Sequence, residues 1–128
     1  MTIYDWVSLM NEKATALAIR TKQYALDIIR FSTTMPNRRE FNIICRQWIR
    51  SGTSVGANYR AACRAKSRAD FIAKMSIVEE ETDESLYWME LLTELGYNDN
   101  IELNRLHNEG NQLLAIVVQS KKTARGNA

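Results

Sequence analysis

The residues of this chain best spaced for acid–base chemistry are two carboxylates, Glu81 and Glu84, which a helix would place on one face. The segments on either side of residues 65–66 both have helical periodicity, and an antiparallel reversal there puts Arg50 at the level of Glu81. An arginine neighbour keeps carboxylates ionised instead of raising a pKa, and no nucleophile accompanies the pair. We therefore interpret the pair as structural and predict no catalytic residue.

The same antiparallel register brings further polar side chains to this level. Glu81 and Glu84 share their side of the helix with apolar residues, and a partly buried carboxylate is unfavourable unless it is paired. We expect Glu81 to pair or hydrogen-bond with Arg50 and the nearby serines, and Glu84 to lie near Arg46 or Gln47. The predicted structural network consists of Arg50, Ser51, Ser54, Asn58, Glu81 and Glu84.

A run of small residues, SGTSVGAN, occupies residues 51–58 and contains Gly52 and Gly56. A phosphate-binding P-loop needs G-x-x-x-x-G-K-[ST] after a strand, and a dinucleotide site needs G-x-G-x-x-G; this run has neither pattern. In a helix each glycine costs about 1 kcal/mol relative to alanine. Two glycines within about one turn therefore indicate a close approach. We expect the next helix of the chain, or a neighbouring subunit, to pack against them.

Metal and thiol chemistry have little support in the sequence. A di-iron site in a helical bundle needs two Glu-x-x-His motifs, whereas the chain has one histidine, His107, preceded three residues earlier by Asn104. Cys45 and Cys63 lie in apolar-periodic segments without metal-ligand spacing, which is typical of core thiols in a reducing cytosol. We expect no metal, no cofactor and no enzymatic activity.

Basic residues gather around the expected reversal near residue 65. The candidate nucleic-acid-binding residues are Arg60, Arg64, Lys66, Arg68 and Lys74, with Arg38 and Arg39 at the opposite end of the same helix. Such clusters bind phosphates largely without sequence preference. The isoelectric point of about 8.6 is low for a dedicated nucleic-acid-binding domain.

Charge is distributed unevenly along the chain. Residues 1–78 contain 13 Lys/Arg and 5 Asp/Glu, a net charge of +8, whereas residues 79–128 contain 4 and 10, a net charge of −6. This polarity fits complementary contacts between copies or a basic face for an anionic partner, or else solvated helix faces of opposite sign. Trp6, Trp48 and Trp88 are interpreted first as core or subunit contacts and second as base-stacking platforms.

These side chains are positioned by four helices, because apolar residues recur every three or four positions almost throughout. We expect helices over about 3–32, 38–64, 68–95 and 100–123, with a frayed tail at 124–128. Pro36 ends the first helix, Ser67 caps the third with Asp70 as partner, and Gly96 terminates it. One of residues 98–100 caps the fourth. The second helix buries a stripe of Phe41, Cys45, Trp48, Gly52, Val55, Tyr59 and Ala62.

Short connections between four helices favour an all-α, antiparallel, up-down-up-down four-helix bundle, formed as one domain over residues 1–128. No apolar run approaches the roughly 18 residues that a spanning helix needs. The N-terminus MTIYDWVSLM lacks the basic and apolar regions of a secretory signal. We therefore expect a cytoplasmic protein without membrane partners.

The segment WIRSGTSVGANYRAACRAKSRADFIAKMSIVEEETDESLYWMELLTELGY, residues 48–97, resembles the four-helix bundle protein family, also called the 23S rRNA intervening sequence proteins. The strongest matches are the run from Arg50 to Asn58, Lys66-Ser67 with Asp70-Phe71-Ile72, Lys74 with Ser76-Ile77, then Glu81, Glu84, Tyr87-Trp88, Leu91-Leu92 and Gly96. The resemblance covers about residues 38–123. The chain departs from the family at Arg60, near where an acidic residue is usual, and at Asp83 and Leu86, where basic residues are common.

The resemblance implies a cytoplasmic bacterial bundle whose relatives form ring-shaped homopentamers. It also implies a relation in fold to the accessory variability protein of diversity-generating retroelements, a ring that binds a reverse transcriptase and nucleic acid. Two functional hypotheses follow. One is a non-enzymatic, homo-oligomeric assembly protein that self-associates or binds a protein partner. The other is a nucleic-acid-binding accessory protein, acting on RNA or DNA beside an enzyme such as a reverse transcriptase.

Overall fold

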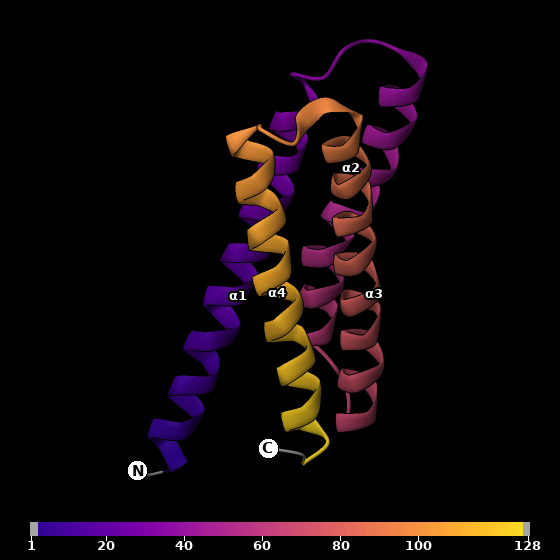
Figure 1. Ribbon diagram of the computed structural model, residues 1–128. Helices are drawn as coiled ribbons and strands as arrows, with labels where there is room; N and C mark the ends of the chain where they lie inside the picture. The colour runs from indigo at the N-terminus through magenta and orange to yellow at the C-terminus, as the bar shows by residue number, and fades with distance from the viewer. Residues whose placement is uncertain (1–2, 127–128) are drawn as a thin grey trace.

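The computed structural model describes the backbone of residues 3–126 and the side chains of residues 11–126. Its elements, in chain order, are α1 (Ile3–Ser32), α2 (Arg39–Ala62), α3 (Arg68–Leu92), a π-helical turn η1 (Thr93–Tyr97) and α4 (Ile101–Ala124). They form the predicted antiparallel, up-down-up-down bundle (Figure 1). Trp6 lies outside the residues whose side chains are described.

Three helix ends carry the local signals that the sequence predicted. The Ser67 hydroxyl accepts the Asp70 backbone N–H at 3.1 Å, and the Asp70 carboxylate accepts the Lys66 N–H at 3.0 Å. Asn100 caps α4 through the Leu103 N–H at 2.9 Å. Gly96 adopts a φ of 114°, a left-handed conformation that favours glycine. Regular α-helix ends at Leu92, three residues earlier than expected, because the chain widens into η1 before this glycine.

The core lies along the centre of the bundle and receives residues from all four helices. Every member of the stripe predicted on α2 is buried. Trp48 is fully buried and meets the Phe31 ring edge-on, with ring centroids 5.7 Å apart. The other large, fully buried side chains are Tyr24, Ile28, Val55, Met75, Val78, Met89, Leu92, Leu103, Leu106, Leu113 and Val117.

The glycines of α2 face α1, not the helix that follows, which corrects the expectation from the sequence. A Cβ at Gly52 would lie 2.5 Å from Ile28 Cδ1, and a Cβ at Gly56 would lie 3.2 Å from Thr21 Oγ1. Ser54 is two residues from Gly56, about 200° around the helix. One flank of α2 therefore carries the glycines toward α1, while the opposite flank carries the polar residues toward α3.

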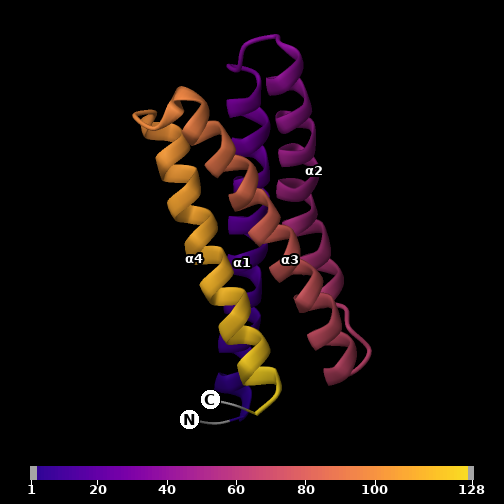
Figure 2. The ribbon, with the colours of Figure 1, turned by 45° about the vertical axis from the view of Figure 1, so that its right-hand side comes forward.

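The two ends of the bundle differ in what they present (Figure 2). The turn between α1 and α2 and the turn between α3 and α4 lie at one end. The turn between α2 and α3 lies at the other end, together with the start of α1 and the end of α4. Within residues 3–126, no helix has both the length and the apolar character that crossing a membrane requires.

Candidate functional site

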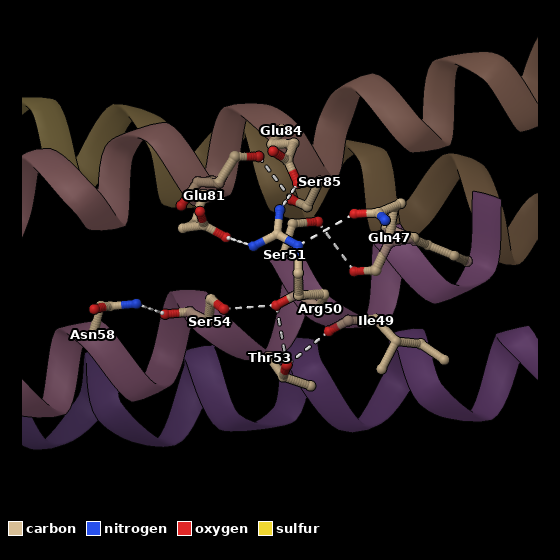
Figure 3. Close-up of polar contacts among 12 residues, drawn as sticks. Gln47, Ile49, Arg50, Ser51, Thr53, Ser54, Asn58, Glu81, Glu84 and Ser85 are labelled. Atoms are coloured by element: carbon tan, nitrogen blue, oxygen red, sulfur yellow. Dashed lines mark hydrogen bonds and ion pairs between the residues drawn. The ribbon is translucent and has the colours of Figure 1, made fainter. Parts of the chain in front are cut away.

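Arg50 joins α2 to both carboxylates of α3 that the sequence singled out (Figure 3). Its Nη1 lies 3.0 Å from Glu81 Oε2, and its Nη2 forms an ion pair with Glu84. The Arg50 Nε also donates to Gln47 Oε1 at 3.3 Å. One guanidinium therefore bridges two carboxylates a turn apart, an arrangement suited to its forked donors.

The small polar residues of the predicted network do not reach Glu81. The Ser51 hydroxyl donates to the Trp48 carbonyl at 3.1 Å, and the Ser54 hydroxyl donates to the Arg50 carbonyl at 2.7 Å. The Asn58 amide donates to the Ser54 carbonyl at 2.8 Å. These side chains bond within their own helix because a short side chain reaches a carbonyl three or four residues back more readily than a neighbouring helix.

Of the two residues expected near Glu84, Gln47 shares the Arg50 guanidinium with it, whereas Arg46 does not pair with it. Arg46 is exposed and forms no ion pair with the described residues, whereas Arg50 holds Glu84. Glu84 additionally accepts the Trp88 indole N–H at 3.3 Å. The three charged side chains of this cluster remain partly exposed, at 47% for Arg50, 18% for Glu81 and 37% for Glu84. The cluster is therefore a surface clamp between α2 and α3.

The turn between α2 and α3 presents a group of exposed cations, which we call the basic turn. Its members, which form no ion pair with other described residues, are Arg60, Arg64, Lys66 and Arg68. Lys74 does not belong to it, because both oxygens of Asp70 lie 2.7 Å from its Nζ. The Lys74 ammonium, followed by the Lys66 N–H, lowers the pKa of Asp70. The spacing Asp70-x-x-x-Lys74 was the sequence signal for this pair.

Two further cations lie at the same end of the bundle and were not singled out from the sequence. Lys122 and Arg125 are exposed near the end of α4, without an ion pair among the described residues. Their neighbour Lys121 is nearly buried and reaches Glu79 of α3 at 3.2 Å. The up-down-up-down order was the available signal, since it places the end of α4 at the same end as the basic turn.

One ion pair within the chain joins a cation of the basic half, Arg20, to a carboxylate of the acidic half, whereas the pair formed by Arg105 joins the two halves in the opposite sense. The Arg20 guanidinium lies 2.6 Å from Glu109, and Arg105 lies 2.9 Å from Asp27. Both contacts join α1 to α4. Hydrogen bonding to carboxylates raises the pKa of each arginine, with Glu109 the main partner of Arg20 and Glu102 that of Arg105.

The histidine and the cysteines occupy separate environments. His107 Nε2 lies 3.5 Å from Glu90, and its Nδ1 lies 3.2 Å from the Asn111 amide. No three His, Cys, Asp or Glu side chains of the described chain gather as a metal site would require. Cys45 is buried, which raises the pKa of its thiol. Cys63 is exposed, contrary to expectation, because it caps the end of α2 beyond the buried stripe.

Several large apolar side chains remain exposed on the outside of the bundle. Those at least half exposed are Ile19, Ile43, Tyr87, Leu95 and Ile101, with Ile101 at 86%. Tyr87 packs edge-on against the half-buried Trp88, with ring centroids 5.1 Å apart. The five side chains are distributed over the chain, one each on α1, α2, α3, η1 and α4.

The fold is that of an antiparallel four-helix bundle protein with charged and exposed apolar side chains on its outside. The chain belongs to the 23S rRNA-intervening sequence protein family, whose sequence pattern matches residues 15–119. It is also similar to a Bacteroides thetaiotaomicron protein of unknown function from the S23 ribosomal protein family, whose crystal structure is known. The two chains share 31% identity with a TM-score of 0.76, covering 83% of this chain and 98% of that one. No curated protein matches the chain.

Proposed function

We propose that this protein is a non-enzymatic scaffold of the bacterial cytoplasm that acts as a homo-oligomer. The observation that supports the proposal most directly is the exposure of Ile19, Ile43, Tyr87, Leu95 and Ile101 on one small bundle. Isolated exposed apolar residues are ordinary. Tyr87 differs because Trp88 supports it, and rigid aromatic side chains are frequent anchors of protein interfaces.

The polar chemistry of the bundle is consistent with this role. Arg50 pairs with both Glu81 and Glu84, so these carboxylates take part in a contact between α2 and α3. When identical subunits contact one another through two different surfaces, each subunit is rotated relative to the last. The assembly is a closed ring if these rotations add up to one full turn. The assembly that we propose is such a ring, with five subunits as the sequence resemblance implied.

Light scattering coupled to size-exclusion chromatography tests this proposal over a micromolar concentration series at physiological salt. Because one chain has a mass of 14.7 kDa, we expect a constant mass at an integer multiple of that value. A species of 14.7 kDa throughout the series would contradict the proposal.

A second candidate function is binding of RNA or DNA, as an accessory to a nucleic-acid enzyme such as a reverse transcriptase. It is favoured by one observation: the four side chains of the basic turn are exposed and free of ion pairs within the described chain. Lys122 and Arg125 add positive charge at the same end of the bundle. Cations that no carboxylate neutralises can release counterions when they contact phosphates.

Fluorescence anisotropy with labelled single-stranded RNA at low salt tests this candidate. Replacing Arg64 and Lys66 by glutamate should weaken binding and flatten the dependence on salt, by about 0.7 in log–log slope for each phosphate that the protein no longer neutralises. Lys13→Glu with Lys22→Glu is the matched control, since both lysines are exposed on α1 and unpaired among the described residues. Equal weakening by both variants would show that the basic turn is not a specific surface.

A further inference from the structure

We propose that two outer faces of this bundle, one on α2 and one on α3, bind each other between neighbouring copies. The inference rests on the proposed self-association and names the surfaces that carry it. The basic face consists of Arg39, Ile43 and Arg46 on α2. The acidic face consists of Asp83, Tyr87 and Glu90 on α3.

The basic face is an apolar side chain between two unpaired cations. Ile43 is 50% exposed, and Arg39 and Arg46 lie four residues before it and three after it. Residues at these spacings share one side of a helix. Both arginines are exposed, and neither forms an ion pair with the described residues. This side of α2 is therefore a basic surface with an apolar centre.

The acidic face has the same layout with the opposite charge. Tyr87 is 53% exposed, with Asp83 four residues before it and Glu90 three after it. Asp83 has no ion pair in the described chain, and the nearest cation candidate for Glu90 is His107 at 3.5 Å. The sequence has no Lys or Arg between Lys74 and Arg105, so this stretch of α3 has no basic residue of its own.

The acidic face is also held in place by the clamp between α2 and α3. Arg50 binds Glu84, Glu84 accepts the Trp88 indole N–H, and Trp88 packs against Tyr87. An aromatic side chain that is already fixed loses little conformational freedom on binding. Tyr87 is therefore suited to serve as the anchor of a contact.

A second copy of this chain is the occupant that fits both faces. Placing Ile43 against Tyr87 brings each arginine opposite a carboxylate whether the two helices run parallel or antiparallel, because both faces have spacings of four and three residues. Charge complementarity of this kind fixes the register and excludes like-charged pairings. The two faces are different surfaces, so the contact is heterologous, and repeating it can close a ring.

Charge exchange tests this contact on the full chain. One variant carries Arg39→Glu and Arg46→Glu, a second carries Asp83→Lys and Glu90→Lys, and a third combines all four substitutions. Each two-site variant places like charges together, so we expect assembly to weaken by at least about tenfold in concentration. The combined variant restores opposite charges and should assemble nearly as well as the original chain. Circular dichroism checks that each variant remains helical.

Lys13→Glu with Lys22→Glu is the matched control for the basic face, since it changes the same charge at exposed, unpaired positions on α1. This control should leave assembly unchanged. Assembly that resists both two-site variants, or that the combined variant fails to restore, would overturn this contact while leaving self-association intact. A monomeric original chain, or a large species that nuclease reduces to the monomer, would overturn self-association as well.

Discussion

The Tyr24 hydroxyl lies 2.7 Å from the Ser85 hydroxyl inside the bundle and links α1 to α3. Ser85 in turn donates to the Thr82 carbonyl at 2.7 Å, so its proton is engaged and Tyr24 is the donor of the pair. Both side chains are buried. Gly110 of α4 makes room for this pair, because a Cβ there would lie 2.7 Å from the Tyr24 oxygen.

This direction of donation predicts unequal effects of removing the two hydroxyls. Tyr24→Phe leaves Ser85 bonded to Thr82 and should cost about 1 kcal/mol, the net contribution of one hydrogen bond. Ser85→Ala leaves a buried tyrosine hydroxyl without a partner and should cost more, about 1–3 kcal/mol. Urea denaturation of both variants provides the measurement. A smaller loss for Ser85→Ala would show that the hydroxyl of Tyr24 has another acceptor.

The burial of tyrosine side chains also makes the free energy of unfolding depend on pH in the alkaline range. Burial is the main cause that raises the pKa of Tyr24, so the folded state holds its proton at pH values where the unfolded chain releases it near pH 10. The folded state then binds more protons, and the free energy of unfolding falls as pH rises through that range. Tyr59 is shifted in the same direction, also mainly by burial. Denaturation from about pH 8 to about pH 11 should show a shallower fall for Tyr24→Phe than for the original chain.

The approach of α1 to Gly52 predicts a specific rescue. Gly52→Ala gains helix propensity of about 1 kcal/mol but forces its Cβ against Ile28 Cδ1, and overpacking costs about 1–3 kcal/mol. Ile28→Val removes that Cδ1 atom. The double variant should therefore lose less free energy of unfolding than the two single variants lose in total. The difference, which is the coupling energy, should be about 1 kcal/mol. Additive losses in urea denaturation would show that Ile28 adjusts without strain.

The Arg50 clamp predicts a salt-dependent contribution to stability. Arg50→Gln leaves two carboxylates a turn apart without their cation, and because the cluster is partly exposed the loss should be about 1 kcal/mol. The loss should shrink when salt rises from about 0.05 M to about 1 M, since screening weakens exposed pairs. Arg60→Gln is the matched control, because this exposed arginine of α2 has no ion pair among the described residues and lies outside both the clamp and the basic face. Equal effects of both variants would contradict a specific role for the clamp.

The bundle and its inward faces could be predicted because helical periodicity marks the inward side of each helix and short connections make successive helices antiparallel. The α2 stripe around Trp48, the Ser67 cap and the positive φ of Gly96 all follow from local patterns that the structure confirms. Periodicity shows which side of a helix points inward but not which neighbour fills it. The prediction that α3 packs against Gly52 was therefore wrong, because α1 and α3 lie on opposite flanks of α2 and Gly52 faces α1.

Side-chain partners were harder to predict than helices. The register placed Arg50 opposite Glu81, and the two do pair. The register could not show that the Ser54 hydroxyl would donate to the Arg50 carbonyl of its own helix. That preference depends on distances shorter than one helical turn, which a register does not resolve. Lys74 was grouped with the candidate nucleic-acid-binding residues without its partner Asp70, which accepts the Lys66 N–H and also holds this lysine.

Native mass spectrometry before and after nuclease treatment tests the central claim of self-association most directly. The account predicts one species at an integer multiple of 14.7 kDa that nuclease leaves unchanged, with five subunits as the expected number. It also predicts that this species needs an at least about tenfold higher concentration when Arg39 and Arg46 become glutamates, and that it returns at the original concentration when Asp83 and Glu90 become lysines in the same chain. A single species of 14.7 kDa from the original chain would contradict the account.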